Sequence, residues 1–345
     1  MKALIIGGTG TISSAVTRLA ANSPDWELFL FNRGNRPDGI PGNVTSIRGD
    51  ATREDEAAAL LHGLSFDCVA QFTGREPEQA MRDIRLFRGR TKQYIFISTA
   101  AAYQTPPPHP FITEGMLQNN PFWEYARKKI ECERLLLEAL REDGFPVTIV
   151  RPSHTYSEDM IPFCLQPGPN SWPVIKRMMD GKRIIVPGDG SSLWTVTFNE
   201  DFARGFMGLM GNPHAVGEAV HITTDESLTW NQMAQAVADE LGVDYKPYYV
   251  PTDALVAMKP ELGGGLNGDK RHSVVYDNAK IKRLVPGFHA TVTWRTGVHR
   301  AMRKILATPS LRPEDPAFDR WCDRVIAIYD EALEKAREAS GDDAT

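Results

Sequence analysis

Hydrophobic residues in the first 150 positions fall into short runs, separated by segments of helical periodicity. The run KALII at 2–6 is followed by apolar residues with the spacing of one helix face, from Ile12 to Ala20. Further runs are WELFLF, VTSI, FDCVAQF, QYIFIS and FPVTIV, and the segments REDEAAALLHG and KKIECERLLLEALREDG predict helices that each end at a glycine. Strands that alternate with helices predict an α/β fold with a mostly parallel, doubly wound sheet of Rossmann type.

The pattern changes beyond residue 160. Four prolines between 162 and 173 predict a long loop. KRIIVPG, WTVTF and AVHIT predict strands, NEDFARGFMGLMG predicts a helix, and Thr229 with Gln232 predicts a capping box that opens another helix. The glycine-rich ELGGGLNGDKRHS predicts a mobile loop, and a last helix is expected over 321–336. We therefore expect a doubly wound domain over 1–160, with returns to it near 183–223, and a smaller α+β domain over most of 161–340.

Composition narrows the class of protein. The chain has 345 residues, more than one hydrophobic core usually supports, and its net charge of −5 argues against a basic nucleic-acid footprint. Its apolar runs are too short to span a bilayer, and a strand that begins at residue 2 predicts no signal peptide. The four cysteines are widely spaced and show no metal-ligand spacing, which favours reduced thiols in a cytoplasmic protein without a bound metal.

The first strand runs directly into the glycine-rich segment GGTGTISSAV. Glycines in a turn between a strand and a helix permit a close approach of a pyrophosphate, and the helix N-terminus offers unpaired N–H groups. Ser13 stands where a third glycine is usual, and its side chain is small enough for close packing. The segment predicts a dinucleotide site, with a tight turn that binds no ligand as the alternative. The expected contacts are Gly7, Gly8, Thr9, Gly10, Thr11 and Ile12.

The second strand ends in Asn32 and Arg33, with Arg36 nearby, where a site that prefers NAD usually has an acidic residue. A guanidinium group suits a 2′-phosphate, so the sequence favours NADP over NAD. Arg33 stacking on the adenine or facing water is the alternative. After the third strand, Asp50 and Ala51 are expected cofactor contacts, although Asp50 could equally cap the following helix.

Four motifs carry a resemblance to a known family. They are GGTGTIS at the N-terminus, FISTAAAY after the fifth strand, YARKK on a predicted helix, and VRPSHTY after the sixth strand. With these motifs in this order, the chain resembles the extended short-chain dehydrogenase/reductases, the NAD(P)-dependent epimerase/dehydratase group, to about residue 300. The resemblance implies an NAD(P)-binding N-terminal domain and a C-terminal substrate-binding domain. It also implies cofactor contacts at Phe72, Thr73, Gly74, Pro152 and Ser153.

The resemblance further implies a catalytic triad. Tyr125 would give and take the proton, Lys129 would bind the nicotinamide ribose and lower the pKa of the tyrosine, and Thr99 would hold the substrate oxygen, with Ser98 as the fallback. The i, i+4 spacing independently places Tyr125 and Lys129 on one helix face. A phenol is a poor base at neutral pH, and a nearby ammonium group stabilises the phenolate.

The chain departs from the family at two positions that contact the diphosphate of a sugar nucleotide. An asparagine is replaced by His154 and an arginine by Trp194. Trp194 could stack on a sugar or base, or belong to the core. His154 could bind a hydroxyl group, act as a second acid or base, or be structural. A free or phosphorylated sugar therefore fits as well as a sugar nucleotide.

These observations predict an NAD(P)-dependent epimerase or dehydrogenase/reductase of carbohydrate metabolism that acts at a carbinol or carbonyl carbon. The alternative is an NADPH-dependent reductase of a non-nucleotide carbonyl compound. A dehydratase would need an acid near the triad, and Ala100 and its neighbours supply none. An RNA-binding protein on the same fold is a further alternative, although the expected partner is a small molecule and neither nucleic acid nor a membrane. The resemblance also implies a homodimer through the helix of Tyr125, unless RLLLEAL packs inside the protomer.

Overall fold

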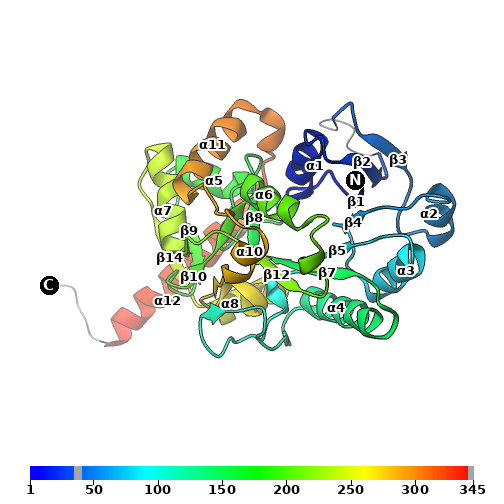
Figure 1. Cartoon of the computed structure of the whole chain (residues 1–345). Helices are drawn as coiled ribbons and strands as arrows, with labels where there is room; N and C mark the ends of the chain where they lie inside the picture. The colour runs from blue at the N-terminus through cyan, green and yellow to red at the C-terminus, as the bar shows by residue number, and fades with distance from the viewer. Residues whose placement is uncertain (35–40, 341–345) are drawn as a thin grey trace. The chain divides into compact units, whose positions relative to one another are not determined.

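The chain folds into two compact units, each built from several segments of sequence. The computed structural model describes residues 1–34 and 41–340 (Figure 1). The first unit comprises Met1–Ser157, Leu193–Ser227 and Gly263–Thr293, and the second comprises Glu158–Ser192, Leu228–Leu262 and the chain from Trp294 onward. The chain thus returns to the first unit twice, at 193–227 and at 263–293.

A seven-stranded parallel sheet forms the centre of the first unit, in the order β12-β7-β5-β4-β1-β2-β3. This sheet confirms the expected Rossmann-type α/β fold. Ile6 at the end of β1 pairs with Phe31 of β2 and Gln71 of β4, so the carboxyl ends of these strands lie together. The strand order reverses between β1 and β4, which is where such sheets bind ligands. The strands are β1 (Lys2–Ile6), β2 (Glu27–Asn32), β3 (Thr45–Arg48), β4 (Cys68–Gln71), β5 (Tyr94–Ile97), β7 (Val147–Pro152) and β12 (Ala219–Ile222).

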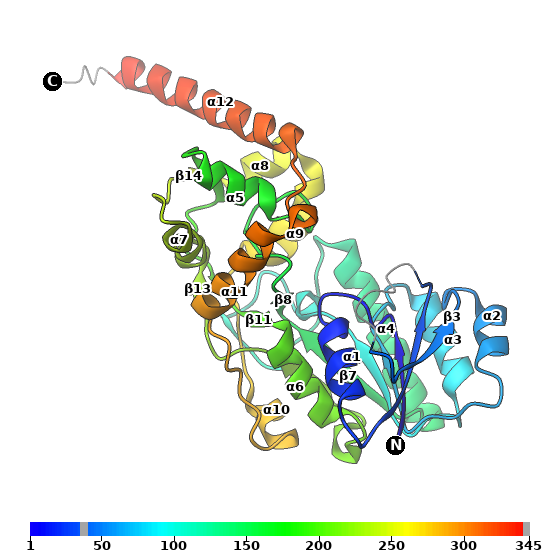
Figure 2. The same ribbon diagram turned by 90° about the horizontal axis from the view of Figure 1, so that it is seen from above.

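Helices cover both faces of this sheet (Figure 2). One apolar core lies between the sheet and the pair α1 (Ser13–Ala21) and α6 (Asn199–Leu209). A second core lies between the opposite face and the helices α2 (Glu54–Leu60), α3 (Pro77–Phe87) and α4 (Glu124–Asp143). Because both faces are covered, the central strands β1, β4 and β5 are apolar at nearly every position instead of alternating.

Shorter elements complete the first unit, several of them near the carboxyl ends of the strands. Strand β8 (His154–Tyr156) pairs with β11 (Val196–Phe198), and β6 (Phe111–Ile112) pairs with β15 (Val275–Tyr276). The glycine-rich stretch expected to be a mobile loop instead forms helical turns, which corrects that expectation. The remaining elements are η1 (Ala100–Ala102), β10 (Leu193–Trp194), η2 (Pro213–Ala215), α9 (Gly263–Gly265), η4 (Leu266–Lys270) and α10 (Ala279–Leu284).

The second unit contains a parallel strand pair and several helices. The pair is β9 (Ile184–Pro187) with β14 (Pro247–Val250), and the expected capping box of Thr229 and Gln232 opens α7 (Trp230–Leu241). The last helix, α12 (Pro316–Ser340), begins before and ends after its predicted bounds. The other elements are α5 (Trp172–Met179), β13 (Leu228–Thr229), α8 (Thr252–Met258), η3 (Pro260–Leu262), α11 (Trp294–Ala307) and η5 (Pro309–Leu311).

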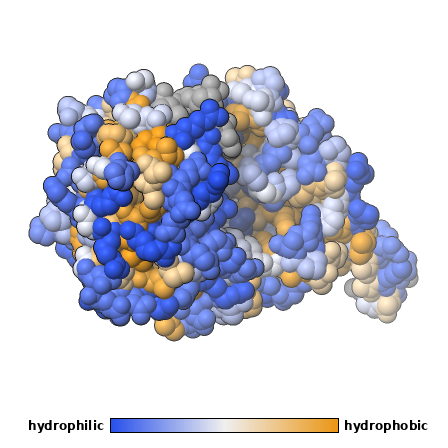
Figure 3. Space-filling model, turned by 90° about the vertical axis from the view of Figure 1, so that its right-hand side faces the viewer, coloured by the Kyte–Doolittle hydropathy of each residue, from blue (hydrophilic) through white to orange (hydrophobic). Residues whose placement is uncertain are grey.

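Hydrophilic residues cover most of the face on which α2 and α3 lie, and hydrophobic residues gather there in separate patches (Figure 3). Within the described ranges, none of the helices has the length and apolar character needed to cross a membrane. All four cysteines are buried and unpaired with one another. Burial raises the pKa of the Cys68 thiol to about 12, so this thiol stays protonated at neutral pH.

Candidate active site

The turn between β1 and α1 requires glycine for steric reasons. Gly7 has φ +82°, and a Cβ atom there would stand 2.1 Å from Cγ2 of Thr73. A Cβ atom on Gly8 would stand 2.3 Å from a methyl group of Leu30. The glycines therefore allow this turn to pack against the ends of β2 and β4, and they leave the backbone exposed to a ligand on the other side.

Ser13 fixes the shape of the same turn by two hydrogen bonds. Its hydroxyl group accepts a hydrogen bond from the Gly10 N–H at 2.8 Å and donates one to the Gly7 carbonyl oxygen at 2.7 Å. Among the described residues, the N–H groups of Thr11 and Ile12 have no acceptor. Free N–H groups at a helix N-terminus suit a pyrophosphate, so the residues present fit a dinucleotide.

A cavity of about 680 Å³ lies over this turn and continues along the ends of β2, β3 and β4. Most of the predicted cofactor contacts line it. Gly8 and Gly74 are not among the lining residues, and Arg36 falls outside the described residues. The predicted residues that line this cavity are Gly7, Thr9, Gly10, Thr11, Ile12, Asn32, Arg33, Asp50, Ala51, Phe72 and Thr73.

The end of β2 offers a cation and no acid to this cavity. Arg33 is exposed and lines the cavity beside Asn32, whose side-chain oxygen accepts a hydrogen bond from the Gly34 N–H at 2.8 Å. The Asp50 carboxylate accepts hydrogen bonds from Thr52, and these bonds, assisted by the charge of Arg33, lower its pKa. Asp50 therefore closes a turn ahead of α2 and is not the residue that caps this helix, which starts after Arg53.

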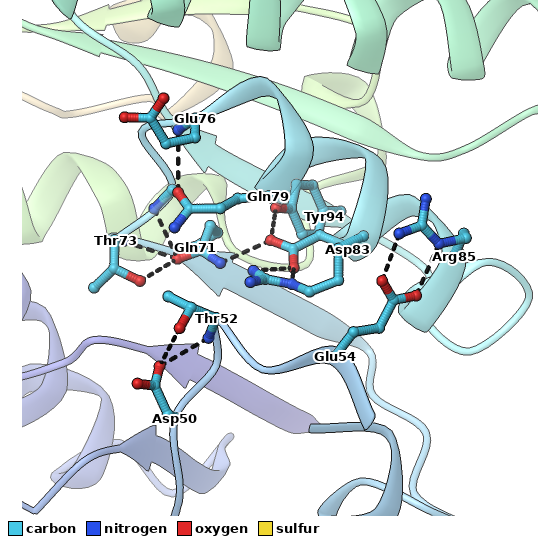
Figure 4. A network of polar contacts seen from close by, with 12 residues as sticks. Asp50, Thr52, Glu54, Gln71, Thr73, Glu76, Gln79, Asp83, Arg85 and Tyr94 are labelled. Atoms are coloured by element: carbon cyan, nitrogen blue, oxygen red, sulfur yellow. Dashed lines mark hydrogen bonds and ion pairs between the residues drawn. The ribbon is translucent and has the colours of Figure 1, made fainter. Parts of the chain in front are cut away.

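Gln71 organises the turn between β4 and α3, a role that the sequence analysis missed (Figure 4). Its side-chain oxygen accepts hydrogen bonds from Thr73 N–H, Thr73 hydroxyl and Gly74 N–H at 2.8, 2.8 and 3.1 Å. Its amide group donates to buried Asp83 at 2.7 Å, which also accepts from Tyr94 at 2.7 Å. The sequence does contain a sign of this role, which is a glutamine at the end of an otherwise apolar strand. A buried side-chain amide at such a position needs hydrogen-bond partners.

A second cavity of about 300 Å³ holds the predicted triad. Thr99, Tyr125 and Lys129 all line it, and it shares Ile12, Phe72 and Arg75 with the cofactor cavity, so the two cavities adjoin. The structure thus brings together residues from β5, α4 and the glycine turn. Also in its lining are the predicted residues Ser98, Pro152, Ser153, His154 and Trp194.

Lys129 is buried and held by backbone groups. Its Nζ atom donates hydrogen bonds to the carbonyl oxygens of Gly74 and Ile97, at 2.5 and 2.6 Å, and lies 4.6 Å from the ring centroid of Phe96. Burial lowers the pKa of Lys129 to about 8. The ammonium group is thereby fixed at the junction of β4, β5 and α4.

The pKa of Tyr125 is set by burial and by two groups that oppose it. Burial raises the pKa of its phenol, and the charge of Arg75 and the hydrogen bond with Thr99 oppose that rise. Lys129 lies 5.8 Å from the ring centroid, yet Arg75 is the cation that lowers the tyrosine pKa. Burial therefore has the larger effect on this pKa, and the opposing charge comes from the β4–α3 turn. The effect of Lys129 on the phenol once a cofactor is bound stays a prediction.

Ser98 is buried, and its hydroxyl group donates a hydrogen bond to the Glu133 carboxylate, which also pairs with Arg151. Thr99 is the hydroxyl group that interacts with Tyr125. The fallback role of Ser98 as a substrate contact is therefore disfavoured, since its hydroxyl group already serves a buried polar cluster beneath the cavity.

His154 and Trp194 lie edge to face, with ring centroids 5.8 Å apart. Burial lowers the pKa of His154 to about 3, assisted by the charge of Lys270, so the imidazole is neutral at physiological pH. Trp194 is 2% exposed. These two positions therefore present neutral, largely apolar rings where the resembling family has diphosphate contacts.

Comparison with known proteins gives one family and several distant relatives. A model of the NAD dependent epimerase/dehydratase family matches residues 3–223. The 2'-dehydrokanamycin reductase of Streptomyces kanamyceticus is 24% identical over 84% of this chain and 80% of its own length. The chloroplast stem-loop binding protein of 41 kDa b of Arabidopsis thaliana is 26% identical over 69% of this chain, which spans 62% of that protein.

Solved structures show the same fold. The UDP-glucuronic acid 4-epimerase of Bacillus cereus, in complex with UDP-glucuronic acid and NAD, superposes with a TM-score of 0.71 at 18% identity. The match covers 89% of this chain and 99% of that one. A glycine turn at the carboxyl end of β1, a doubly wound parallel sheet and a family match over most of the chain lead to one conclusion. The chain belongs to the NAD dependent epimerase/dehydratase family and is an NAD(P)-dependent enzyme.

Proposed function

We propose that this enzyme transfers a hydride at a carbinol or carbonyl carbon of a sugar or sugar-nucleotide-like substrate. The observation that carries this proposal is the convergence of Thr99, Tyr125 and Lys129 on a cavity that adjoins the dinucleotide cavity. Bound NAD(P) supplies the hydride acceptor or donor.

In this proposal the three side chains divide the work on the substrate. The Thr99 hydroxyl group holds the substrate oxygen, and Tyr125 takes the hydroxyl proton during oxidation or returns it during reduction. Lys129 has two of its three N–H groups committed to Gly74 and Ile97, which leaves the third for the ribose of the dinucleotide. Arg75, at the junction of the two cavities, favours the phenolate form of Tyr125.

A second candidate is an NADPH-dependent reductase of a non-nucleotide carbonyl compound. The neutral rings of His154 and Trp194 favour it, because they offer no cation to a diphosphate at these positions. The relative that is a 2'-dehydrokanamycin reductase agrees with such a substrate. For the cofactor we propose NADP, supported by exposed Arg33 and by the missing acid at Asn32.

The first experiment identifies the nicotinamide and its fate. Purified protein is denatured, released nicotinamide is identified by mass and absorbance, and NADPH and NADH are titrated by fluorescence. Retained oxidised cofactor supports an epimerase-like cycle, whereas reversible binding with NADPH tighter than NADH supports the reductase. Tyr125→Phe should lower kcat/KM by about 100- to 10,000-fold while leaving cofactor affinity within about threefold. A protein that binds neither nucleotide contradicts the proposal.

RNA binding is kept as a distinct outcome because one relative is named a stem-loop binding protein. A gel-shift assay with a stem-loop RNA at several salt concentrations measures it directly. A complex that weakens steeply with salt would support this reading, since phosphate contacts release counterions.

A further inference from the structure

The glycine-rich segment 263–270 is pinned beside the active site. The Asn120 side chain donates hydrogen bonds to the carbonyl oxygens of Gly268 and Ala101, at 2.6 and 2.8 Å. A Cβ atom on Gly264 would stand 2.6 Å from the ring of Trp123. A Cβ atom on Gly268 would stand 2.9 Å from the Cβ atom of Trp123. The glycines thus let the segment pack against the residues that precede α4, the helix of Tyr125.

This packing places Asp269 in the cavity of the triad. Asp269 lines the cavity together with Thr99 and Tyr125, and it also lines a small inner cavity of about 20 Å³. Ala100 and Ala101 line both of these cavities as well. Asp269, which is far from Thr99 in the sequence, therefore lines the cavity beside Ala100 and Ala101. The residues that directly follow Thr99 are small and apolar and provide no carboxyl group.

The surroundings of Asp269 keep its two protonation states close in free energy. Enclosure by the protein raises its pKa to about 7, and the charge of adjacent Lys270 opposes the rise. Its negative charge in turn raises the pKa of Tyr125 and Tyr276. Among the described residues no cation forms an ion pair with Asp269. The other titratable side chains that line its two cavities are Arg75, Lys129, His154, Tyr103 and His272.

We propose that Asp269 is a second acid–base residue of this active site, which exchanges a proton at the carbon next to the carbonyl group held by Thr99 and Tyr125. This inference rests on the proposed function for the placement of that carbonyl group. The C–H bond breaks and its proton passes to a carboxylate oxygen of Asp269. The electron pair forms the C=C bond of an enol, whose oxygen takes the proton of Tyr125. The reverse steps return a proton to carbon, and no oxidation or reduction occurs.

The test measures deuterium incorporation from D₂O by mass spectrometry, with NADPH oxidation followed in parallel. The probes are dihydroxyacetone and D-fructose, two small polyhydroxylated ketones, and the variants are Asp269→Asn and Asp55→Asn, the latter an exposed control on α2. We expect wild type and D55N to incorporate deuterium at least tenfold faster than D269N. D55N should oxidise NADPH at the wild-type rate, within about threefold.

The outcomes separate this inference from the proposed function. Equal incorporation by D269N and wild type, or no incorporation by wild type above buffer, overturns the role of Asp269 whatever the NADPH result. Incorporation without NADPH oxidation supports Asp269 and counts against the proposed hydride transfer. If D269N does not fold, the test is the pH profile of deuterium incorporation by the wild-type enzyme, after the rate in buffer alone has been subtracted. It should rise as pH passes through about 7, where Asp269 ionises, and a flat profile contradicts the proposal.

Discussion

At the scale of single residues, Lys129 is a buried cation whose charge burial disfavours. It is 2% exposed and donates to two carbonyl oxygens, and within the described part of the chain it forms no ion pair. A buried ammonium group without a counter-ion favours its neutral form. The pKa of about 8 places the change of charge near the pH at which the enzyme would work.

Lys129→Met should change how stability depends on pH. Because the folded-state pKa is about 8 and the ordinary value is 10.5, the folded protein binds fewer protons than the unfolded chain between these values. The cost of burying the charge is full below this window and disappears above it. The free energy of unfolding of wild type should therefore rise with pH relative to K129M, by at most about 1.4 kcal/mol per pH unit.

Urea unfolding between pH 7 and 10.5 measures this difference, the upper limit being the ordinary lysine pKa. Lys92→Met, at a side chain that is 83% exposed, serves as the control and should follow the wild-type pH profile. A difference between wild type and K129M that stays constant over this range would show that Lys129 is not held as a buried charge.

At the scale of elements, the turns at the carboxyl ends of the strands depend on polar anchors. Gln71 connects β4 to α3 through Asp83 and holds the N–H groups of Thr73 and Gly74. The carbonyl group of Gly74 accepts in turn from Lys129 of α4. The position of Lys129 is therefore linked to the turn that lines the larger cavity.

Gln71→Leu should destabilise this turn and weaken cofactor binding. The substitution leaves Asp83 and two N–H groups short of partners, which should lower the free energy of unfolding by about 1–3 kcal/mol. The affinity for NADPH should fall by about tenfold or more, measured by fluorescence titration. Gln235→Leu on the exposed side of α7 is the control and should change neither quantity. Wild-type affinity in Q71L would show that the turn is held by other contacts.

At the scale of the whole molecule, each described residue that lines the two candidate-site cavities belongs to the first unit. The chain's second return to this unit, 263–293, contributes Asp269 and Tyr276. The leucines of RLLLEAL are largely accounted for within the protomer, because Leu136 is fully buried and Leu137 and Leu140 pack on the same core. The homodimer remains a prediction that these leucines do not by themselves support.

NADPH should protect a defined set of segments from hydrogen exchange. We expect slower exchange in the β1–α1 turn, the β4–α3 turn and the start of α4, because a ligand that binds only the folded state stabilises it. Mass spectrometry after peptic digestion measures this effect. Peptides from α7 and α12 of the second unit provide the internal comparison, and protection confined to them would contradict the placement of the cofactor.

The sequence alone determined the fold class. It also determined most of the candidate-site residues that follow the carboxyl ends of the strands. Alternating apolar runs specify a doubly wound sheet, and the carboxyl ends of parallel strands then meet at one edge. This is why Gly7, Arg33, Thr99 and Tyr125 could be placed near one another from their motifs. The i, i+4 spacing of Tyr125 and Lys129 is likewise a local property of a helix.

Only the tertiary structure decided the contacts made by segments far apart in the chain. Asp269 lies in a stretch whose glycines indicate a loop, and its place beside Ala100 depends on Asn120 and Trp123. The net direction of the Tyr125 pKa shift was also decided there, because burial and the charge of Arg75 depend on packing. Local periodicity carries no information on such long-range pairings, since they are set by how the elements fill the core together.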